Sequence, residues 1–275
     1  MPRAHNGPIE IEYEAFGDLS DPTIIATPGL GNQMLLYPVE LCEAFVDRGF
    51  SMIRIDNRDA GLSSLTSNDN EYTLHDMGDD VVAVLDHAGV DKAVVLGMSL
   101  GGMIAQTVAV DHPDRTLAMV SVSSTTGEAG VGSATPEALA AMQRPSSSTI
   151  EEQVASDLEL RRIWSNPEWF DEDQMRAYFQ SLYDRSFTPG GSERQLAAIM
   201  RSGDRAEGLA SLPVPALVVH GTNDTLIDIS GGRRTAELIP NAQFLEIDGM
   251  SHDFVYQMWP PLISAVTSLV SAIPA

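Results

Sequence analysis

The stretch Gly97-Met98-Ser99-Leu100-Gly101 constrains the fold of this chain more than any other. The residues before it, 93–96, form an apolar, β-branched run that predicts a buried strand, and residues 103–109 place apolar side chains at helical spacing. Ser99 is therefore expected on a sharp strand-to-helix turn, with a glycine two residues away on each side where strand and helix approach closely. Such a turn would point the Ser99 hydroxyl and the Leu100 amide toward the same bound group. The Leu100 amide would lie at the N-terminus of the helix. The alternative is a plain turn of small residues, which short patterns often produce.

The order of the other predicted elements indicates an α/β protein. Strand and helix alternate from residue 50 to residue 122, which is typical of a parallel sheet with helices on its faces. The alternating run 9–14 predicts an antiparallel edge strand with one wet face. Further strands are expected at 23–27, 51–56, 93–98, 117–122, 215–220 and 243–247, and helices at 38–48, 77–88, 233–239 and from residue 260.

The strand signals vanish between residues 126 and 209, where Gly, Ser and Pro stand among helical patches. We therefore predict a core of residues 1–125 and 210–275, with a mostly parallel, doubly wound sheet, and a helical cap of residues 126–209 inserted in it. The aromatic side chains of the cap are each expected to pack, although as a group they could wall an apolar site. They are Trp164, Trp169, Phe170, Tyr178, Phe179, Tyr183 and Phe187.

Charge and composition exclude several classes of partner. With 16 basic and 39 acidic residues the formal charge is −23, which repels nucleic-acid phosphates and acidic membrane surfaces. A single cysteine, Cys42, allows no internal disulfide and no thiol cluster for a metal, and we expect no metal or cofactor. The N-terminus lacks the apolar stretch of a secretion signal, and no run approaches the ~18 apolar residues of a membrane helix, so a cytoplasmic location is expected. The sequence predicts no particular oligomeric state.

Three polar residues follow the ends of predicted strands. Ser99 follows strand 93–98, Asp224 follows 215–220 and His252 follows 243–247. Because the carboxyl ends of parallel strands share one rim, where ligands bind, these side chains are expected to meet. A serine hydroxyl is a weak nucleophile, so His252 would take its proton and return it to the leaving group. Asp224 would orient the imidazole and stabilise its charged form.

A second glycine-rich loop, Pro28-Gly29-Leu30-Gly31-Asn32, follows the predicted strand 23–27. The glycines on both sides of Leu30 would free its amide to turn inward. Leu30 is thus the candidate second donor to an oxyanion, beside Leu100. The alternative is a plain glycine turn.

Other histidines and acids compete poorly for these roles. His220, at the tip of a buried strand, is expected to pack and to hydrogen-bond, although it could touch the site. Asp228 and Asp253 are close enough in sequence to question Asp224, but Asp253 would point away from its neighbour His252 and Asp228 lies later in its loop. The remaining histidines, expected at the N-terminus or near helix ends away from the rim, are His5, His75, His87 and His112.

Taken together, the segments GMSLGG, PGLG, HGTND and GMSH resemble the α/β-hydrolase superfamily of serine hydrolases over essentially the whole chain. The chain order Ser99, Asp224, His252 is the order of that superfamily. Segments 54–63 and 194–199 resemble the aclacinomycin methylesterase type of carboxylesterase. Taken by themselves, residues 57–63 predict a structural loop held by internal hydrogen bonds and ion pairs. Two departures from the superfamily pattern, Pro28 in place of a common His and Met250-Ser251 in place of a small residue and Gly, remove no catalytic group.

The resemblance implies a cofactor-independent serine hydrolase whose partner is a small-molecule ester. We expect a carboxylic ester, such as a methyl ester, of a bulky apolar acid. Three alternatives stay open: a cofactor-free haloperoxidase or perhydrolase, a carbon–carbon bond hydrolase, and a hydrolase-fold receptor that acts by binding its ligand and contacting a protein partner. A haloalkane dehalogenase is disfavoured, because its nucleophile position needs a carboxylate and this chain has Ser99.

Overall fold

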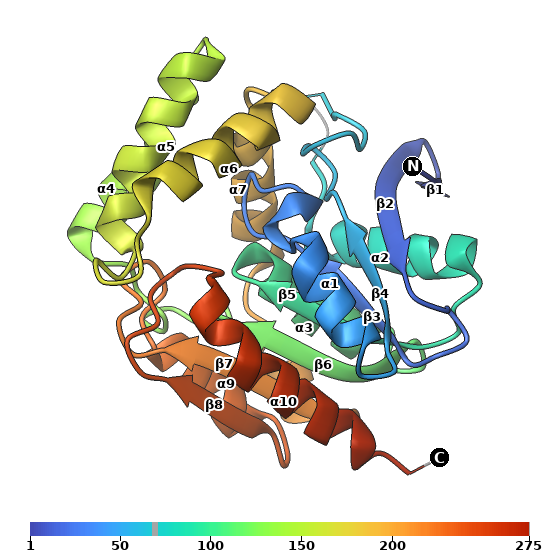
Figure 1. Ribbon diagram of the computed structural model, residues 1–275. Helices are drawn as coiled ribbons and strands as arrows, with labels where there is room; N and C mark the ends of the chain where they lie inside the picture. Colours follow the sequence, from blue (N-terminus) through green and yellow to red (C-terminus); the bar gives the residue numbers. More distant parts are fainter. Residues whose placement is uncertain (68–70, 275) are drawn as a thin grey trace.

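The computed structural model describes residues 1–67 and 71–274. Its described residues form an eight-stranded sheet in the order β1-β2-β4-β3-β5-β6-β7-β8 (Figure 1). Strands β3 to β8 run parallel to one another, and β1 and β2 are antiparallel at one edge, which confirms the predicted α/β class. The strands are β1 (Arg3–Asn6), β2 (Ile9–Phe16), β3 (Thr23–Thr27), β4 (Ser51–Ile55), β5 (Ala93–Met98), β6 (Thr116–Val122), β7 (Ala216–Gly221) and β8 (Gln243–Ile247).

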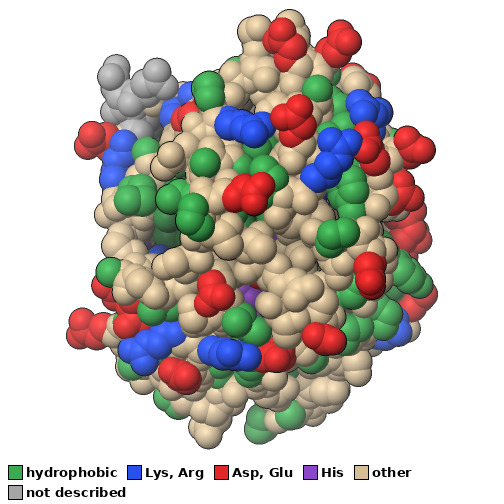
Figure 2. Space-filling view, turned by 90° about the vertical axis from the view of Figure 1, so that its left-hand side faces the viewer, with side chains coloured by type: hydrophobic (Ala, Val, Ile, Leu, Met, Phe, Trp, Pro, Cys, Tyr) green, Lys and Arg blue, Asp and Glu red, His purple; other side chains and the backbone are tan. Residues whose placement is uncertain are grey.

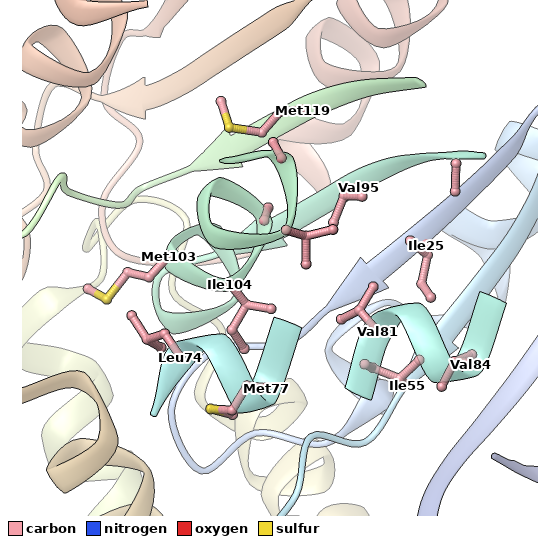
Figure 3. Packing of buried hydrophobic residues seen from close by; sticks show 14 of the residues in the cluster. Ile25, Ile55, Leu74, Met77, Val81, Val84, Val95, Met103, Ile104 and Met119 are labelled. Carbon is pink, nitrogen blue, oxygen red and sulfur yellow. The ribbon is translucent and has the colours of Figure 1, made fainter. Parts of the chain in front are cut away.

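Helices cover both faces of the sheet. Helices α1 (Val39–Val46) and α10 (Trp259–Ser271) lie on one face, and α2 (Leu74–Ala88) and α3 (Leu100–Asp111) lie on the other (Figure 1). Successive strand residues point to opposite faces. Ile24 therefore packs with α1 and α10, whereas Ile25 belongs to the cluster beneath α2 and α3. Figure 3 shows side chains of α2 and α3 packed beside the sheet. Burial of each large apolar side chain contributes about 1.5–3 kcal/mol to the stability of the fold.

Several helix boundaries differ from those that periodicity predicts. Helix α2 begins at Leu74, because Thr73 and Asp76 form a reciprocal capping box ahead of its first apolar side chains. Helix α1 is shorter than predicted, since Pro38 is its N-cap and Asp47 its C-cap. Helix α9 (Ser230–Leu238) begins three residues before the predicted start at Arg233. Strand β1 was not predicted from the sequence, because its four residues are too few to show a periodic pattern.

Five helices lie between β6 and β7, in the stretch predicted to be a cap. Helices α5 and α6 pack on each other around Val154, Leu158, Phe179 and Leu182. In contrast, Ala198 of α7 and Leu209 of α8 belong to the same cluster as α2 and α3. The division of the chain at residues 125/126 and 209/210 therefore stays a prediction. The helices are α4 (Pro136–Met142), α5 (Ile150–Trp164), α6 (Glu172–Arg185), α7 (Gly191–Ser202) and α8 (Ala206–Ala210).

The surface is rich in carboxylates. On the face shown in Figure 2, Asp and Glu side chains are spread from top to bottom, with basic side chains between them. Cys42 is buried in α1. Within residues 1–67 and 71–274, no helix combines the length and the apolar character needed to cross a membrane. The same residues contain no cluster of three or more His, Cys, Asp or Glu suited to a metal ion.

Replacing Gly101 with Ala should destabilise the protein by about 3 kcal/mol. A Cβ atom there would lie 1.9 Å from the Thr27 carbonyl oxygen, so the backbone of β3 or α3 must move. Gly78 in α2 is the matched control, because its Cβ would lie 3.4 Å from Val108 Cγ2, at ordinary contact distance. Gly78→Ala should be neutral or stabilise by up to about 1 kcal/mol. Urea unfolding measures both, and equal effects would contradict the packing argument.

Candidate active site

Ser99 lies where β5 ends and α3 begins, on a strained turn. Its φ is +58° and its ψ is −118°, a conformation that costs a residue with a side chain about 1–3 kcal/mol. The turn persists because the surrounding backbone is packed around it: a Cβ on Gly97 would lie 2.0 Å from the Gly101 carbonyl oxygen. The Ser99 amide donates to Val122 O at 2.9 Å, which ties the turn to β6. The predicted strand-to-helix turn with its two glycines is thus present.

His252 and Asp224 meet at the same edge of the sheet. Asp224 lies in the loop after β7 and His252 in the loop after β8. His252 Nδ1 is 2.8 Å from Asp224 Oδ2, and both side chains are almost entirely buried. A carboxylate can only accept, so Nδ1 donates and Nε2 is the ring nitrogen left with a free lone pair in the neutral imidazole.

The surroundings of Asp224 favour its ionised form. Its Oδ1 accepts from the amides of Leu226 at 3.0 Å and Ile227 at 2.8 Å. Burial alone would raise the pKa of Asp224, but the charge of His252, the hydrogen bonds from His220 and His252 and the charge of His220 together hold it well below its usual value. Asp224 is therefore a carboxylate that can stabilise a positive charge on His252.

His220 is a second histidine beside this carboxylate. It is fully buried, and its Nε2 lies 2.8 Å from Ile227 O and 3.5 Å from Asp224 Oδ2. Because a carbonyl only accepts, Nε2 donates to Ile227 O and fixes the loop that follows β7. His220 is thus buried and hydrogen-bonded, as expected from the sequence.

The candidate oxyanion loop lies beside Ser99. Strands β3 and β5 are neighbours, and a Cβ on Gly29 would lie 3.5 Å from Ser99 Cβ. Asn32 N donates to Gly29 O at 3.1 Å and Gly31 has φ +68°, which together form a type II turn with Leu30 at its second position. In the part of the chain that the structure describes, neither the Leu30 amide nor the Leu100 amide donates to a protein acceptor.

Ser99 and His252, the predicted nucleophile and base, are not joined by a hydrogen bond. Among the described residues, Ser99 Oγ has no hydrogen-bond partner and neither has His252 Nε2. In proteins without bound substrate such contacts are often long and tighten only in the complex. Ser99 is half-buried, so its hydroxyl is open to a ligand.

The competing residues are engaged elsewhere. Asp253 Oδ1 accepts from Arg161 Nη1 at 2.6 Å, and the exposed Asp228 accepts from the Ser230 amide at 2.9 Å. His112 pairs with Asp79, at the far end of α3 from Ser99. The structure thus pairs His252 with Asp224 and with neither of the other two acids.

Contacts of Arg161 and Trp164 were not foreseen from the sequence. His252 N donates to Trp164 O at 3.0 Å, and Arg161 Nη1 donates to His252 O at 3.2 Å. Helix α5 therefore holds the backbone of the histidine loop on both sides. No local pattern in the sequence signals these contacts, because their partners are about ninety positions apart.

The loop 57–63 is held differently from the expectation. Some of its bonds are internal, such as Ala60 N to Asn57 O at 3.1 Å. Its ion pairs, however, reach other elements: Arg58 pairs with Asp80 of α2, and Asp59 pairs with Arg194 of α7. The expectation of internal ion pairs was wrong, because the loop is short and its charges are buried between helices that supply the partners.

A cavity of about 180 Å³ adjoins the candidate oxyanion loop. The loop contributes Leu30, Gly31 and Asn32 to its wall. Four of the seven aromatic side chains noted above line it, namely Trp164, Phe179, Tyr183 and Phe187, whereas Trp169, Phe170 and Tyr178 line a separate groove on the other side of Arg161. Ser99 is not part of the cavity wall.

The fold and the site together are of the hydrolase type. The sheet is mostly parallel, Ser99 lies on a strained turn after β5, and the His252–Asp224 pair lies at the same edge. The family described as the alpha/beta hydrolase fold matches residues 22–257, and the chain belongs to this family. This confirms the resemblance inferred from the sequence.

Named relatives share most of the chain. It is 27% identical over 280 residues to the rhodomycin D methylesterase DauP of Streptomyces sp. (strain C5), with 92% of each chain covered. It is 25% identical over 244 residues to 3-oxoadipate enol-lactonase 2 of Acinetobacter baylyi, covering 89% of this chain and 86% of the relative. The crystal structure of esterase RhEst1 from Rhodococcus sp. ECU1013 has a similar fold, with a TM-score of 0.81, 24% identity and 99% of both chains covered.

Replacing Asp224 with Asn should lower the free energy of unfolding near neutral pH. Because the pKa of Asp224 is lower in the folded than in the unfolded chain, its contribution is present above the unfolded pKa and is lost as the pH falls toward the folded value. The difference between wild type and variant should therefore shrink below a pH of about 4.

Urea unfolding at a series of pH values measures this difference. Asp228→Asn is the matched control, because the Asp228 carboxylate is exposed and solvent screens its interactions, so a much smaller difference is expected. A difference for Asp224→Asn that does not change with pH would contradict the assignment of a stabilised carboxylate.

Proposed function

We propose that this protein is a cofactor-independent serine hydrolase that cleaves a carboxylic ester through an acyl-enzyme, with Ser99 as nucleophile, His252 as base and Asp224 as its orienting acid. The observation that supports this most is the buried His252–Asp224 hydrogen bond of 2.8 Å at the sheet edge where Ser99 lies on its strained turn. The named methylesterase and enol-lactonase relatives support the same class, since a lactone is an internal ester.

In this proposal the reaction begins with proton transfer from Ser99 Oγ to His252 Nε2. The oxygen then attacks the ester carbonyl, and the imidazolium returns its proton to the departing alcohol. Asp224 keeps Nδ1 protonated and stabilises the imidazolium charge in a buried site, where electrostatic interactions are strong. Water, activated by the same imidazole, attacks the acyl-enzyme, releases the acid and restores Ser99.

We assign the oxyanion site to the Leu30 and Leu100 amides. They come from loops after neighbouring strands, and the Leu100 amide stands at the N-terminus of α3, where the helix dipole favours negative charge. Each such donor contributes roughly 10²–10³ in rate. Their freedom from protein acceptors among the described residues supports this role.

We propose that the 126–209 segment acts as a cap whose cavity selects the substrate. The cavity, of about 180 Å³, is somewhat larger than the ~150 Å³ apolar cavity that holds benzene in an engineered protein. Its wall combines aromatic side chains with polar ones such as Arg144, Asp157 and Arg161, so a group of about one ring would fit beside Leu30 by volume. A bulkier acid would extend beyond this cavity. We propose that the alcohol of the ester is small, such as methanol.

Replacing Ser99 with Ala should abolish turnover of p-nitrophenyl esters and covalent labelling by a fluorophosphonate, because Oγ forms the covalent bond in both. Ser271→Ala, at the exposed end of α10, is the control and should leave both unchanged. Mass spectrometry of the labelled wild type should place the adduct on the Ser99 peptide. Turnover or labelling that persists in Ser99→Ala would remove Ser99 from its role.

Replacing His252 with Asn should lower kcat by about 10⁶, by analogy with the loss of the base in a serine protease. His112→Asn is a matched control, because His112 Nε2 also lies 2.8 Å from a carboxylate, on Asp79. That pair is one helix length from Ser99, about 18 Å, and its loss should leave kcat nearly unchanged. A similar loss in both variants would indicate damage to the fold and count against the assignment.

A further inference from the structure

The side chain of Gln195 connects α7 to the loop that contains Leu30. Gln195 is fully buried, and its Oε1 accepts from the Gly31 amide at 2.9 Å. Its Nε2 donates to Arg58 O at 2.8 Å. The orientation of this side-chain amide is unambiguous, because the Gly31 N–H can only donate and the Arg58 carbonyl can only accept.

The Gly31 amide is the group that decides the form of the turn. In a type II turn the peptide between the second and third residues, here Leu30 and Gly31, is flipped relative to its direction in a type I turn. Gly31 tolerates this because it has no side chain and adopts φ +68°. The acceptor on Gln195 stabilises the flipped peptide, because Gln195 is fully buried and its Oε1 would otherwise lose its donor, which costs about 1–3 kcal/mol.

The rest of the loop is held by neighbours on both sides. Asn57 Nδ2 donates to Pro28 O at 2.9 Å, and Tyr178 Oη donates to Asn32 Oδ1 at 3.0 Å. Helix α7 cannot shift easily, because a Cβ on Gly191 would lie 2.0 Å from the Asp59 carbonyl oxygen. Gln195 is thus fixed at its backbone as well as at its amide.

We propose that Gln195 is a positioning residue: by holding the Leu30–Gly31 peptide it fixes the turn that carries the Leu30 amide, so that helix α7 is part of the machinery that stabilises the oxyanion. This inference rests on the function proposed above. It predicts that loss of the Gln195 amide weakens the binding of the transition state while the binding of the neutral substrate changes little. A helix that only covered the site would not have this effect.

The first test is Gln195→Leu, which keeps the size of the side chain and removes both hydrogen bonds. We expect kcat for p-nitrophenyl acetate to fall by about 10- to 100-fold, as misplacement of a catalytic group by about 1 Å does, with KM changed less than about 3-fold. The affinity for a trifluoromethyl ketone, which forms a tetrahedral oxyanion on Ser99, should fall by the same factor as kcat. A structural role alone would lower the melting temperature and leave both kcat and the inhibitor affinity of the folded protein close to wild type.

The second test is Gln195→Glu, followed over pH. A protonated carboxyl both accepts from Gly31 and donates to Arg58 O, whereas a carboxylate only accepts and faces the Arg58 carbonyl. The charged groups nearby are paired, Arg58 with Asp80 and Asp59 with Arg194. The activity of Gln195→Glu relative to wild type at the same pH should therefore rise as the pH falls. A ratio that stays flat would overturn the proposal, and this variant decides the matter if Gln195→Leu does not fold.

Gln106→Leu is the matched control. Gln106 is also fully buried and also uses both ends of its amide, donating to Ser121 Oγ at 3.1 Å and accepting from Arg205 Nε at 3.0 Å. It should lose stability and retain wild-type values of both kcat and inhibitor affinity. Wild-type protein that hydrolyses no ester and takes no label at Ser99 would refute the proposed function itself. Active wild type with Gln195→Leu equal to it in kcat and inhibitor affinity would refute the inference alone.

Discussion

The contact between β3, β5 and the first turn of α3 is the constraint on which the rest of the structure depends. The backbones meet without side chains between them: a Cβ at Gly97 would lie 2.0 Å from the Gly101 carbonyl oxygen, and one at Gly101 would lie 1.9 Å from Thr27 O. Thr27 Oγ1 also donates to Gly101 O at 2.9 Å. This packing forces the chain to turn within one residue, which places Ser99 at positive φ and directs the N-terminus of α3 at the sheet edge.

The second feature is a carboxylate held in its charged form inside the protein. Two amides of its own loop and two histidines surround Asp224, and the balance of these interactions overcomes the cost of burial. A buried charge without such partners would be costly. The loop after β7 is therefore held around Asp224 by these contacts, and His220 holds the same loop through Ile227 O.

The 126–209 segment contributes more than a cover over the sheet. Arg161 and the carbonyl of Trp164 hold the loop of His252, and Gln195 holds the loop of Leu30. Arg185 of α6 reaches Asp56, whose other oxygen accepts from the Met34 amide at 2.8 Å. This segment consequently contacts both sides of the candidate site, and the same hydrogen bonds join its helices to the loops of His252 and Leu30.

By itself the sequence determined the class of fold, the strained serine turn and the rim where Ser99, Asp224 and His252 lie. These features depend on local periodicity, on glycine spacing and on the rule that parallel strands end at one edge, all of which act over a few residues. Only the tertiary structure decided which side chains hold those groups in place. The side-chain amide of Gln195 binds the Gly31 amide, 164 positions away in the sequence. Such a pairing depends on how helices pack against loops, and no local sequence pattern predicts that packing.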